Sequence, residues 1–235
     1  NVIHAVLEKF QQRYPDGLPE DTAALNELFD LGRIEFGAWL EQPEIAALWW
    51  PRFERAMQWF LIYERARREG GFRPALLEQE GQIDLEAPAG VFTLKAKADR
   101  IDRHDTDGRL AILDYKTGNP PTPKQVNSGL SPQLALEAAI AQAGGFTGLS
   151  AAEIAELVYI RLGGGAVPGE EKRIEGTSRT EIPLAAELAR GWVARYDDER
   201  IPYLSRPRPQ FVDYPGDYDH LARVAERAEG TGEGS

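Results

Sequence analysis

Cysteine is absent from the 235 residues of this chain. Its absence excludes disulfide bonds, thiolate zinc sites and iron–sulfur clusters ligated by cysteine. Any metal ion must then be held by oxygen atoms or imidazole, the ligands that hard divalent cations accept. The sequence therefore predicts no iron–sulfur cluster and, where a metal is bound, a hard divalent cation.

Long apolar runs are also missing. No stretch approaches the roughly 18 uninterrupted apolar residues of a membrane-spanning helix, and residues 1–10 lack the apolar segment of a signal peptide. We therefore expect no membrane contact and a cytoplasmic location. The first residue is Asn1 rather than methionine, which suggests a fragment or a processed chain.

Basic residues are too few to balance the acidic ones, and the formal net charge is −11. Such a charge argues against a protein that coats nucleic acid, because phosphate contacts need lysine and arginine. It leaves open a nucleic-acid enzyme with a local basic groove, since the field of one groove can differ from that of the whole surface.

The pattern of apolar residues changes near residue 72. Helical spacing predicts helices before this point, at 4–14, 23–40, from Pro43 and at 51–71. Beyond it, alternation and turn residues predict strands at 75–85, 91–102, 109–116 and 156–162. Two helices are expected among these strands, at 131–145, with Ser131 as its N-cap, and at 183–200.

The segment ADRIDRHDTDGRLAILDYKTG (98–118) holds the residues with the clearest chemistry. Asp114 and Lys116 are two apart on a strand and share a face. Asp99 lies on the antiparallel neighbour, where facing residues come within roughly 5 Å. Two carboxylates and an ammonium that converge suit a divalent metal. The alternative is a solvated surface pair, because Asp-x-Lys alone occurs often by chance.

This segment and the following SPQLALEAA together resemble the PD-(D/E)xK nuclease superfamily. Within it, they resemble the RecB-like nuclease domain of AddB-type helicase–nuclease subunits. The order of motifs is the same: a helix with histidine, then A-x-x-D-x-x-D, then D-Y-K, then Q-L. Residues 43–60 and 206–226 add to the resemblance, which covers nearly the whole chain. Many AddB-type subunits carry a four-cysteine iron–sulfur clasp, which this chain cannot form.

The resemblance implies a role for six residues. Four of them would supply the metal ligands, which are His4, Asp99, Asp114 and the carbonyl of Tyr115. Lys116 would be the catalytic lysine, and Gln133 would lie beside the active site at the start of its helix. Together with Lys116 and Gln133, Asp99 and Asp114 make up the catalytic set.

The resemblance also implies a fold and an activity. The fold is α/β, a restriction-endonuclease-like mixed sheet flanked by helices. One nuclease domain (1–229) would comprise a helical part (1–72), a core (73–200) and a C-terminal docking segment (201–229), with 230–235 as a disordered tail. The activity would be a Mg²⁺-dependent deoxyribonuclease, an exonuclease that acts with an AddA-type subunit in double-strand-break repair. The alternative is a non-catalytic module that clamps DNA or docks a partner.

Other residues allow two interpretations each. Glu78 and Glu80 alternate to one face of a strand, and they belong either to a solvated surface or beside the metal. Trp49 and Trp50 could stack on bases, but their apolar setting favours packing in the core. Asp102 faces away from Asp99 by alternation, so we expect it to pair with an arginine.

Overall fold

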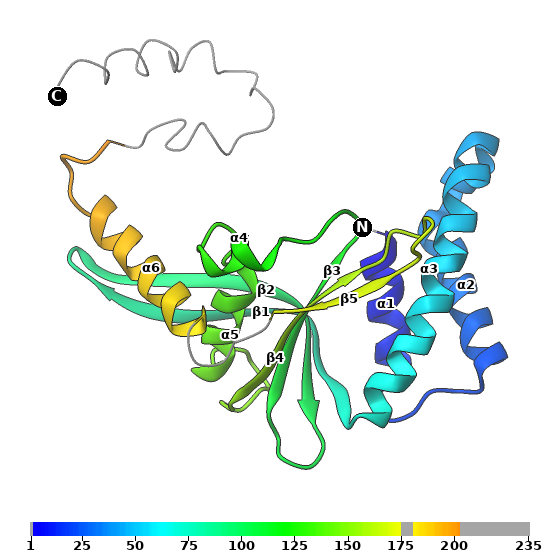
Figure 1. Cartoon of the computed structure of the whole chain (residues 1–235), viewed down its shortest axis with the longest axis horizontal. Helices are drawn as coiled ribbons and strands as arrows, with labels where there is room; N and C mark the ends of the chain where they lie inside the picture. Colours follow the sequence, from blue (N-terminus) through cyan, green and yellow to red (C-terminus); the bar gives the residue numbers. More distant parts are fainter. Residues whose placement is uncertain (1, 175–180, 203–235) are drawn as a thin grey trace, which may run out of the picture.

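One mixed sheet of five strands organises the computed structural model of the chain, which describes residues 2–174 and 181–202 (Figure 1). The strands follow one another across the sheet in chain order: β1 (Phe72–Ala87), β2 (Gly90–His104), β3 (Leu110–Lys116), β4 (Ile154–Arg161) and β5 (Glu170–Arg173). β3 and β4 are parallel, and the other neighbours are antiparallel. The predicted α/β fold class, a mixed sheet flanked by helices, is confirmed.

The helices expected in residues 1–72 form a layer on one face of the sheet (Figure 1). They are α1 (Val2–Arg13), α2 (Asp21–Phe36), the short 3₁₀ helix η1 (Gly37–Glu41) and α3 (Pro43–Glu69). Phe10 of α1 and Phe60 of α3 are fully buried in one cluster with Leu113 of β3 and Ile160 of β4. Alternate residues of the central strands therefore hold this helical layer on the sheet.

Helix α3 continues through Pro51 as one helix of 27 residues, although the sequence predicts separate helices from Pro43 and from residue 51. A proline inside a helix removes one backbone hydrogen bond and costs about 3 kcal/mol. Phe53, Met57 and Phe60 are buried on the same helix. Each buried side chain of this kind stabilises by roughly 1.5–3 kcal/mol, which offsets the cost of the proline.

The opposite face of the sheet is covered by α5 (Gln133–Gln142) and α6 (Glu181–Tyr196), with α6 along the β1–β2 hairpin (Figure 1). Parallel strands need a crossover connection, and α5 lies in the one that joins β3 to β4. Leu134 and Ala138 of α5 are buried in a second cluster with Ile112 of β3. This packing brings the first turn of α5 to the end of β3.

The structure also differs from the prediction in detail. Strand β5 and the short helix α4 (Pro123–Asn127) were not expected. Ser131 is not the N-cap of α5, because the helix begins after Pro132 and has no side-chain cap. Residues 203–235, which include most of the expected docking segment and the whole tail, lie outside the described residues. Within those residues, no helix is both long and apolar enough to span a membrane.

Candidate active site

The site begins where the ladder between β2 and β3 ends. Pairing runs from Arg103 with Leu110 to Arg100 with Leu113, and stops there. Beyond that pair, the side chain of Asp99 replaces the ladder, because its Oδ2 accepts a hydrogen bond of 2.9 Å from the backbone N–H of Tyr115. The Asp99 carboxylate therefore closes the end of the strand pair.

Asp114, Lys116 and Gln133 form a hydrogen-bonded cluster between β3 and α5. Lys116 Nζ donates to Asp114 Oδ1 at 2.9 Å and to Gln133 Oε1 at 3.3 Å. Gln133 Nε2 donates to the same Asp114 oxygen at 2.7 Å. The other oxygen, Oδ2, lies 2.7 Å from Lys116 Nζ, an ion-pair distance, but the directional hydrogen bond goes to Oδ1. Asp114 is thus held by two donors on one face of β3.

His4 of α1 reaches the same strand ends from the other helical layer. Its Nε2 lies 3.1 Å from the carbonyl oxygen of Tyr115, and its Nδ1 lies 3.3 Å from Glu78 Oε1. Asp99 Oδ1 is 3.5 Å from the same Nδ1. His4, Glu78 and Asp99 each offer one ligand atom within 4.8 Å of the others, an arrangement that could hold a metal ion.

Glu78 has a backbone conformation that alternation along a strand does not predict. Its φ is 47°, which lies in the left-handed region and costs a residue with a Cβ atom about 1–2 kcal/mol. Its Oε1 faces His4, while its Oε2 lies 2.7 Å from Lys97 Nζ. Glu80, two residues on, is exposed. The interpretation of both glutamates as one solvated face is therefore wrong for Glu78.

Charges in the site shift one another's pKa values. Burial raises the pKa of Asp114, the hydrogen bond from Lys116 lowers it, and the charge of Asp99 raises it again, with a net increase. The hydrogen bond with Asp99 raises the pKa of His4 and outweighs the effect of burial, with further increases from the charges of Asp99 and Glu78. Without a cation, the site therefore binds protons more readily than isolated groups do.

Glu137 is a buried carboxyl that the sequence analysis missed. It is 1% exposed and lies one turn after Gln133 on α5, whose Nε2 donates to Glu137 Oε1 at 3.1 Å. Burial raises its pKa to about 8. The spacing of four residues from Gln133 was the available signal, because such residues share a helix face.

A buried ionic network joins α3 to β2 and to the side chain of Tyr115. Arg100 Nη1 donates to Glu64 Oε2 at 2.6 Å and to the hydroxyl of Tyr115 at 3.2 Å. Asp102 pairs with both Arg100 and Arg67, as expected for a residue that faces away from Asp99. Burial raises the pKa of Asp102, but the two guanidinium groups outweigh it and lower the pKa. The network fixes Tyr115, whose carbonyl belongs to the site.

The six residues expected at the site thus lie together at the ends of β2 and β3. They fall into two groups. One contains His4, Asp99 and the carbonyl of Tyr115, with Glu78 added; the other contains Asp114, Lys116 and Gln133. Carboxylate and carbonyl oxygens suit hard divalent ions such as Mg²⁺ and Mn²⁺, and imidazole suits transition-metal ions. This set of mostly oxygen ligands, without any thiolate, is therefore suited to a divalent metal ion.

Comparison with known sequences identifies the family of the chain. The sequence model of the PD-(D/E)XK nuclease superfamily matches residues 1–211, nearly the whole chain. The chain belongs to the PD-(D/E)XK nuclease superfamily. Nucleases of this superfamily typically use divalent metals, and the His4, Glu78 and Asp99 group offers a place for one.

The curated proteins that the chain resembles in sequence are larger. An uncharacterized protein of Rickettsia typhi is 28% identical over 170 residues, which are 69% of this chain and 19% of the relative. Another, from Rickettsia conorii, is 29% identical over 150 residues, 63% of this chain and 18% of the relative. The matched part of the chain thus spans less than a fifth of these relatives.

A solved structure, the crystal structure of SSO0001, resembles the chain at a TM-score of 0.33 and 16% identity. The similarity covers 80% of this chain and 83% of that one. The superfamily assignment rests on the sequence match.

Proposed function

We propose that this chain is a metal-dependent deoxyribonuclease that hydrolyses phosphodiester bonds at the ends of β2 and β3. The observation that carries the proposal is the convergence of His4, Asp99 and the Tyr115 carbonyl beside the Asp114–Lys116 pair. Superfamily membership supports the same reaction class. Asp99, Asp114, Lys116 and Gln133 are its catalytic residues.

Mg²⁺ or Mn²⁺ would be held by His4, Asp99, Asp114 and the carbonyl of Tyr115, with Glu78 as a further oxygen ligand. When bound, the ion supplies Lewis-acid chemistry at the phosphate. His4 now contacts the Tyr115 carbonyl directly, and an imidazole that serves as a ligand must present an unprotonated nitrogen. His4 would therefore hold the ion as a neutral imidazole, through whichever ring nitrogen carries no proton.

Lys116 is suited to contact the attacking water or a phosphate oxygen. An ammonium group has three donors, and two of them are used by Asp114 and Gln133. Within residues 2–174 and 181–202 no other residue accepts a hydrogen bond from Nζ, so the third donor would serve a substrate oxygen. Gln133 positions both Asp114 and Lys116, since its amide bonds to each of them.

The biological setting is a helicase–nuclease complex of the AddB type, in which the chain is the exonuclease domain. Two observations support this setting: the D-Y-K and Q-L motifs resemble those of AddB-type subunits, and the curated relatives are several times longer than the matched segment. In this proposal, the partner is an AddA-type subunit and the substrate is the DNA of a double-strand break. The single domain extends over residues 1–229.

The test is cleavage of end-labelled single-stranded DNA by the full chain in Mn²⁺, in Mg²⁺ and in EDTA. We expect cleavage only with a divalent ion, and loss of cleavage in Asp114→Asn, because the amide cannot supply the negative charge. Glu80→Gln is the matched control, as it removes an exposed strand carboxylate near the site. Cleavage that survives Asp114→Asn, or that persists in EDTA, would contradict the proposal.

A further inference from the structure

A groove of about 530 Å³ lies beside the proposed active site. One wall comes from η1 and the first half of α3, and the other from the turns that follow β3 and β4. Thr117 and Gly118, which directly follow Lys116, line it. Its volume falls within the range of ligand-binding pockets, about 300–1,000 Å³. Because Thr117 and Gly118 follow the last residue of β3, the groove adjoins the end of the strand that carries Asp114 and Lys116.

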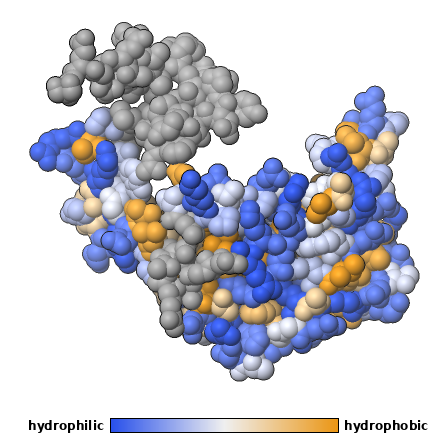
Figure 2. Space-filling model, viewed as in Figure 1, coloured by the Kyte–Doolittle hydropathy of each residue, from blue (hydrophilic) through white to orange (hydrophobic). Residues whose placement is uncertain are grey.

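Two tryptophans in this groove are turned to solvent. Trp39 of η1 is 65% exposed and Trp49 of α3 is 50% exposed. The expectation that Trp49 packs in the core is therefore wrong, although Trp50 does pack against Phe36 and Phe53. Figure 2 shows the first turns of α3 projecting from the body of the protein, with apolar side chains near the tip. Exposed indoles at a groove indicate a binding surface.

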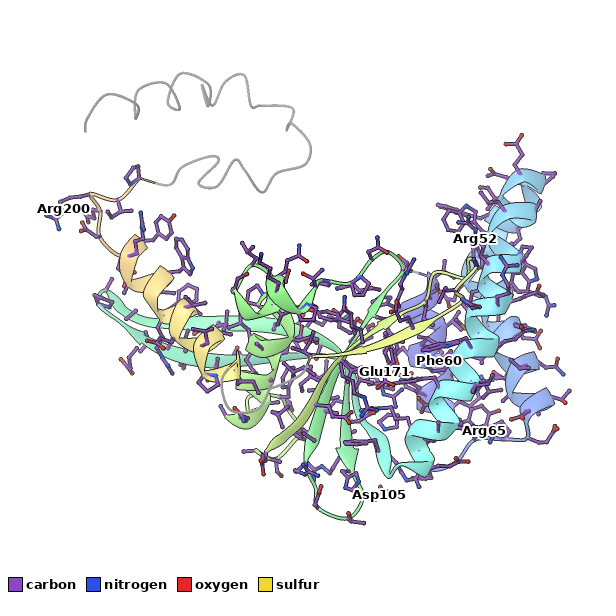
Figure 3. The ribbon with its side chains drawn as sticks, in the orientation of Figure 1. Arg52, Phe60, Arg65, Asp105, Glu171 and Arg200 are labelled. Carbon is purple, nitrogen blue, oxygen red and sulfur yellow. The ribbon has the colours of Figure 1, made fainter. Side chains whose placement is uncertain are left out.

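A cation without a carboxylate partner lies on the same wall. The guanidinium of Arg52 is 5.8 Å from the ring centre of Trp49, and within residues 2–174 and 181–202 it has no carboxylate within 4.0 Å. Figure 3 shows Arg52 beside the connection between β4 and β5. That connection is held in place, because Arg55 Nε donates to the carbonyl of Gly164 at 2.9 Å. Arg52 lies on the same helix as Arg55, so its guanidinium lies beside this anchored connection.

We propose that this groove binds the bases of single-stranded DNA next to the scissile phosphate. The proposal rests on the proposed function, since it names the form of the substrate. Indole rings stack on every base, but only unpaired bases expose their faces. A strand with its phosphate at Lys116 would place neighbouring nucleotides beside Thr117, and Arg52 supplies a charge for the backbone. Local charge is needed, because the chain as a whole carries −11.

The test measures binding of the full chain to fluorescent oligothymidylate by anisotropy, in EDTA so that the proposed cleavage cannot occur. A second probe has the same length and charge but abasic sites in place of the bases. The variants are Trp39→Ala/Trp49→Ala and Arg52→Gln. Trp192→Ala is the matched control, because Trp192 is an exposed indole on α6, across the sheet from α3.

We expect the double variant to bind oligothymidylate at least about tenfold more weakly, given the usual loss per stacked base. The wild type should bind the abasic probe about as weakly as the double variant binds oligothymidylate. The double variant should bind the two probes with equal affinity. Arg52→Gln should reduce the slope of log K against log salt by about 0.7 to 1. Trp192→Ala should behave as the wild type does.

Equal affinity of the wild type for both probes, or an unchanged Kd in the double variant, would overturn the proposal. So would failure of the wild type to bind either probe. A change of oligomeric state in the double variant, measured by size exclusion, would assign the groove to a second copy instead. The proposed nuclease function is tested separately by the cleavage assay. Metal-dependent cleavage without base-dependent binding would overturn only the proposal for the groove. Base-dependent binding without cleavage would overturn only the proposed nuclease function.

Discussion

The backbone N–H of Tyr115 donates its hydrogen bond to Oδ2 of Asp99, over 2.9 Å. The second oxygen of Asp99, Oδ1, lies 3.5 Å from His4 Nδ1. One carboxylate therefore ends the pairing of β2 with β3 and also faces the imidazole of the proposed metal site. The substitution Asp99→Asn separates these two roles, because an amide oxygen can still accept the hydrogen bond from Tyr115 but the amide carries no charge.

Asp99→Asn should fold as well as the wild type in EDTA, but should lose most of its stabilisation by Mn²⁺. A ligand at one hundred times its Kd stabilises the native state by about 2.7 kcal/mol. The measurement is the melting temperature with and without Mn²⁺, and Glu80→Gln should keep the full increase. An equal increase in Asp99→Asn would place the ion elsewhere.

Breaking the buried network beneath Tyr115 should destabilise the whole fold. Glu64→Gln removes the charge that faces Arg100, a fully buried guanidinium. Arg100 keeps its pair with Asp102, but the buried guanidinium groups of Arg68 and Arg100 then share one carboxylate fewer. Loss of one partner from a buried ion pair costs about 3–5 kcal/mol. Urea unfolding measures this loss.

The exposed Arg33–Asp30 pair serves as the control for that experiment. Asp30→Asn should cost less than about 1 kcal/mol, as exposed pairs do. A loss in Glu64→Gln as small as that of Asp30→Asn would show that the network does not stabilise the fold.

Glu137 should make the protein less stable as the pH rises from about 4.3 to about 8. Burial raises its pKa to about 8 in the folded chain, whereas an unfolded glutamate titrates near 4.3. Between these values the native state holds a proton that the unfolded state has lost. The stabilisation is complete below about pH 4.3 and falls by up to about 1.4 kcal/mol per pH unit towards 8.

Glu137→Gln has no such proton, so its free energy of unfolding should fall less over the same range. The two proteins are compared by urea unfolding in EDTA at several pH values from 5 to 8. As the pH rises, the free energy of unfolding of the variant should increase steadily relative to that of the wild type. Parallel curves would show that Glu137 is ionised in the folded chain.

The sequence predicts the strand pair and the residues on it because strand alternation is a local rule. Asp114 and Lys116 are two apart, and the turn after His104 fixes which residues of β2 lie opposite them. The local sequence is therefore enough to predict the hairpin and which of its charged side chains lie together. The resemblance to the nuclease superfamily added His4 and Gln133, which come from elements far away in the sequence.

Features that depend on tertiary contacts were not predictable in this way. Glu78 reaches His4 from a left-handed backbone conformation that alternation does not describe. Helix α3 passes through Pro51 because burial offsets its cost. Trp49 has an apolar setting in the sequence, yet the fold leaves its position on α3 uncovered among the described residues. Each of these depends on what the rest of the fold covers.

Cleavage by Lys116→Ala tests the central claim most directly. The variant keeps Asp99, Asp114 and His4, so it should fold normally and show the wild-type increase in melting temperature with Mn²⁺. In the proposed mechanism the ammonium acts in the transition state, so cleavage of single-stranded DNA should be at least about 100-fold slower. Lys9→Ala, which removes a lysine from an exposed pair with Glu35 on the helical layer, is the control. Cleavage by Lys116→Ala within a few fold of the wild type would contradict the account.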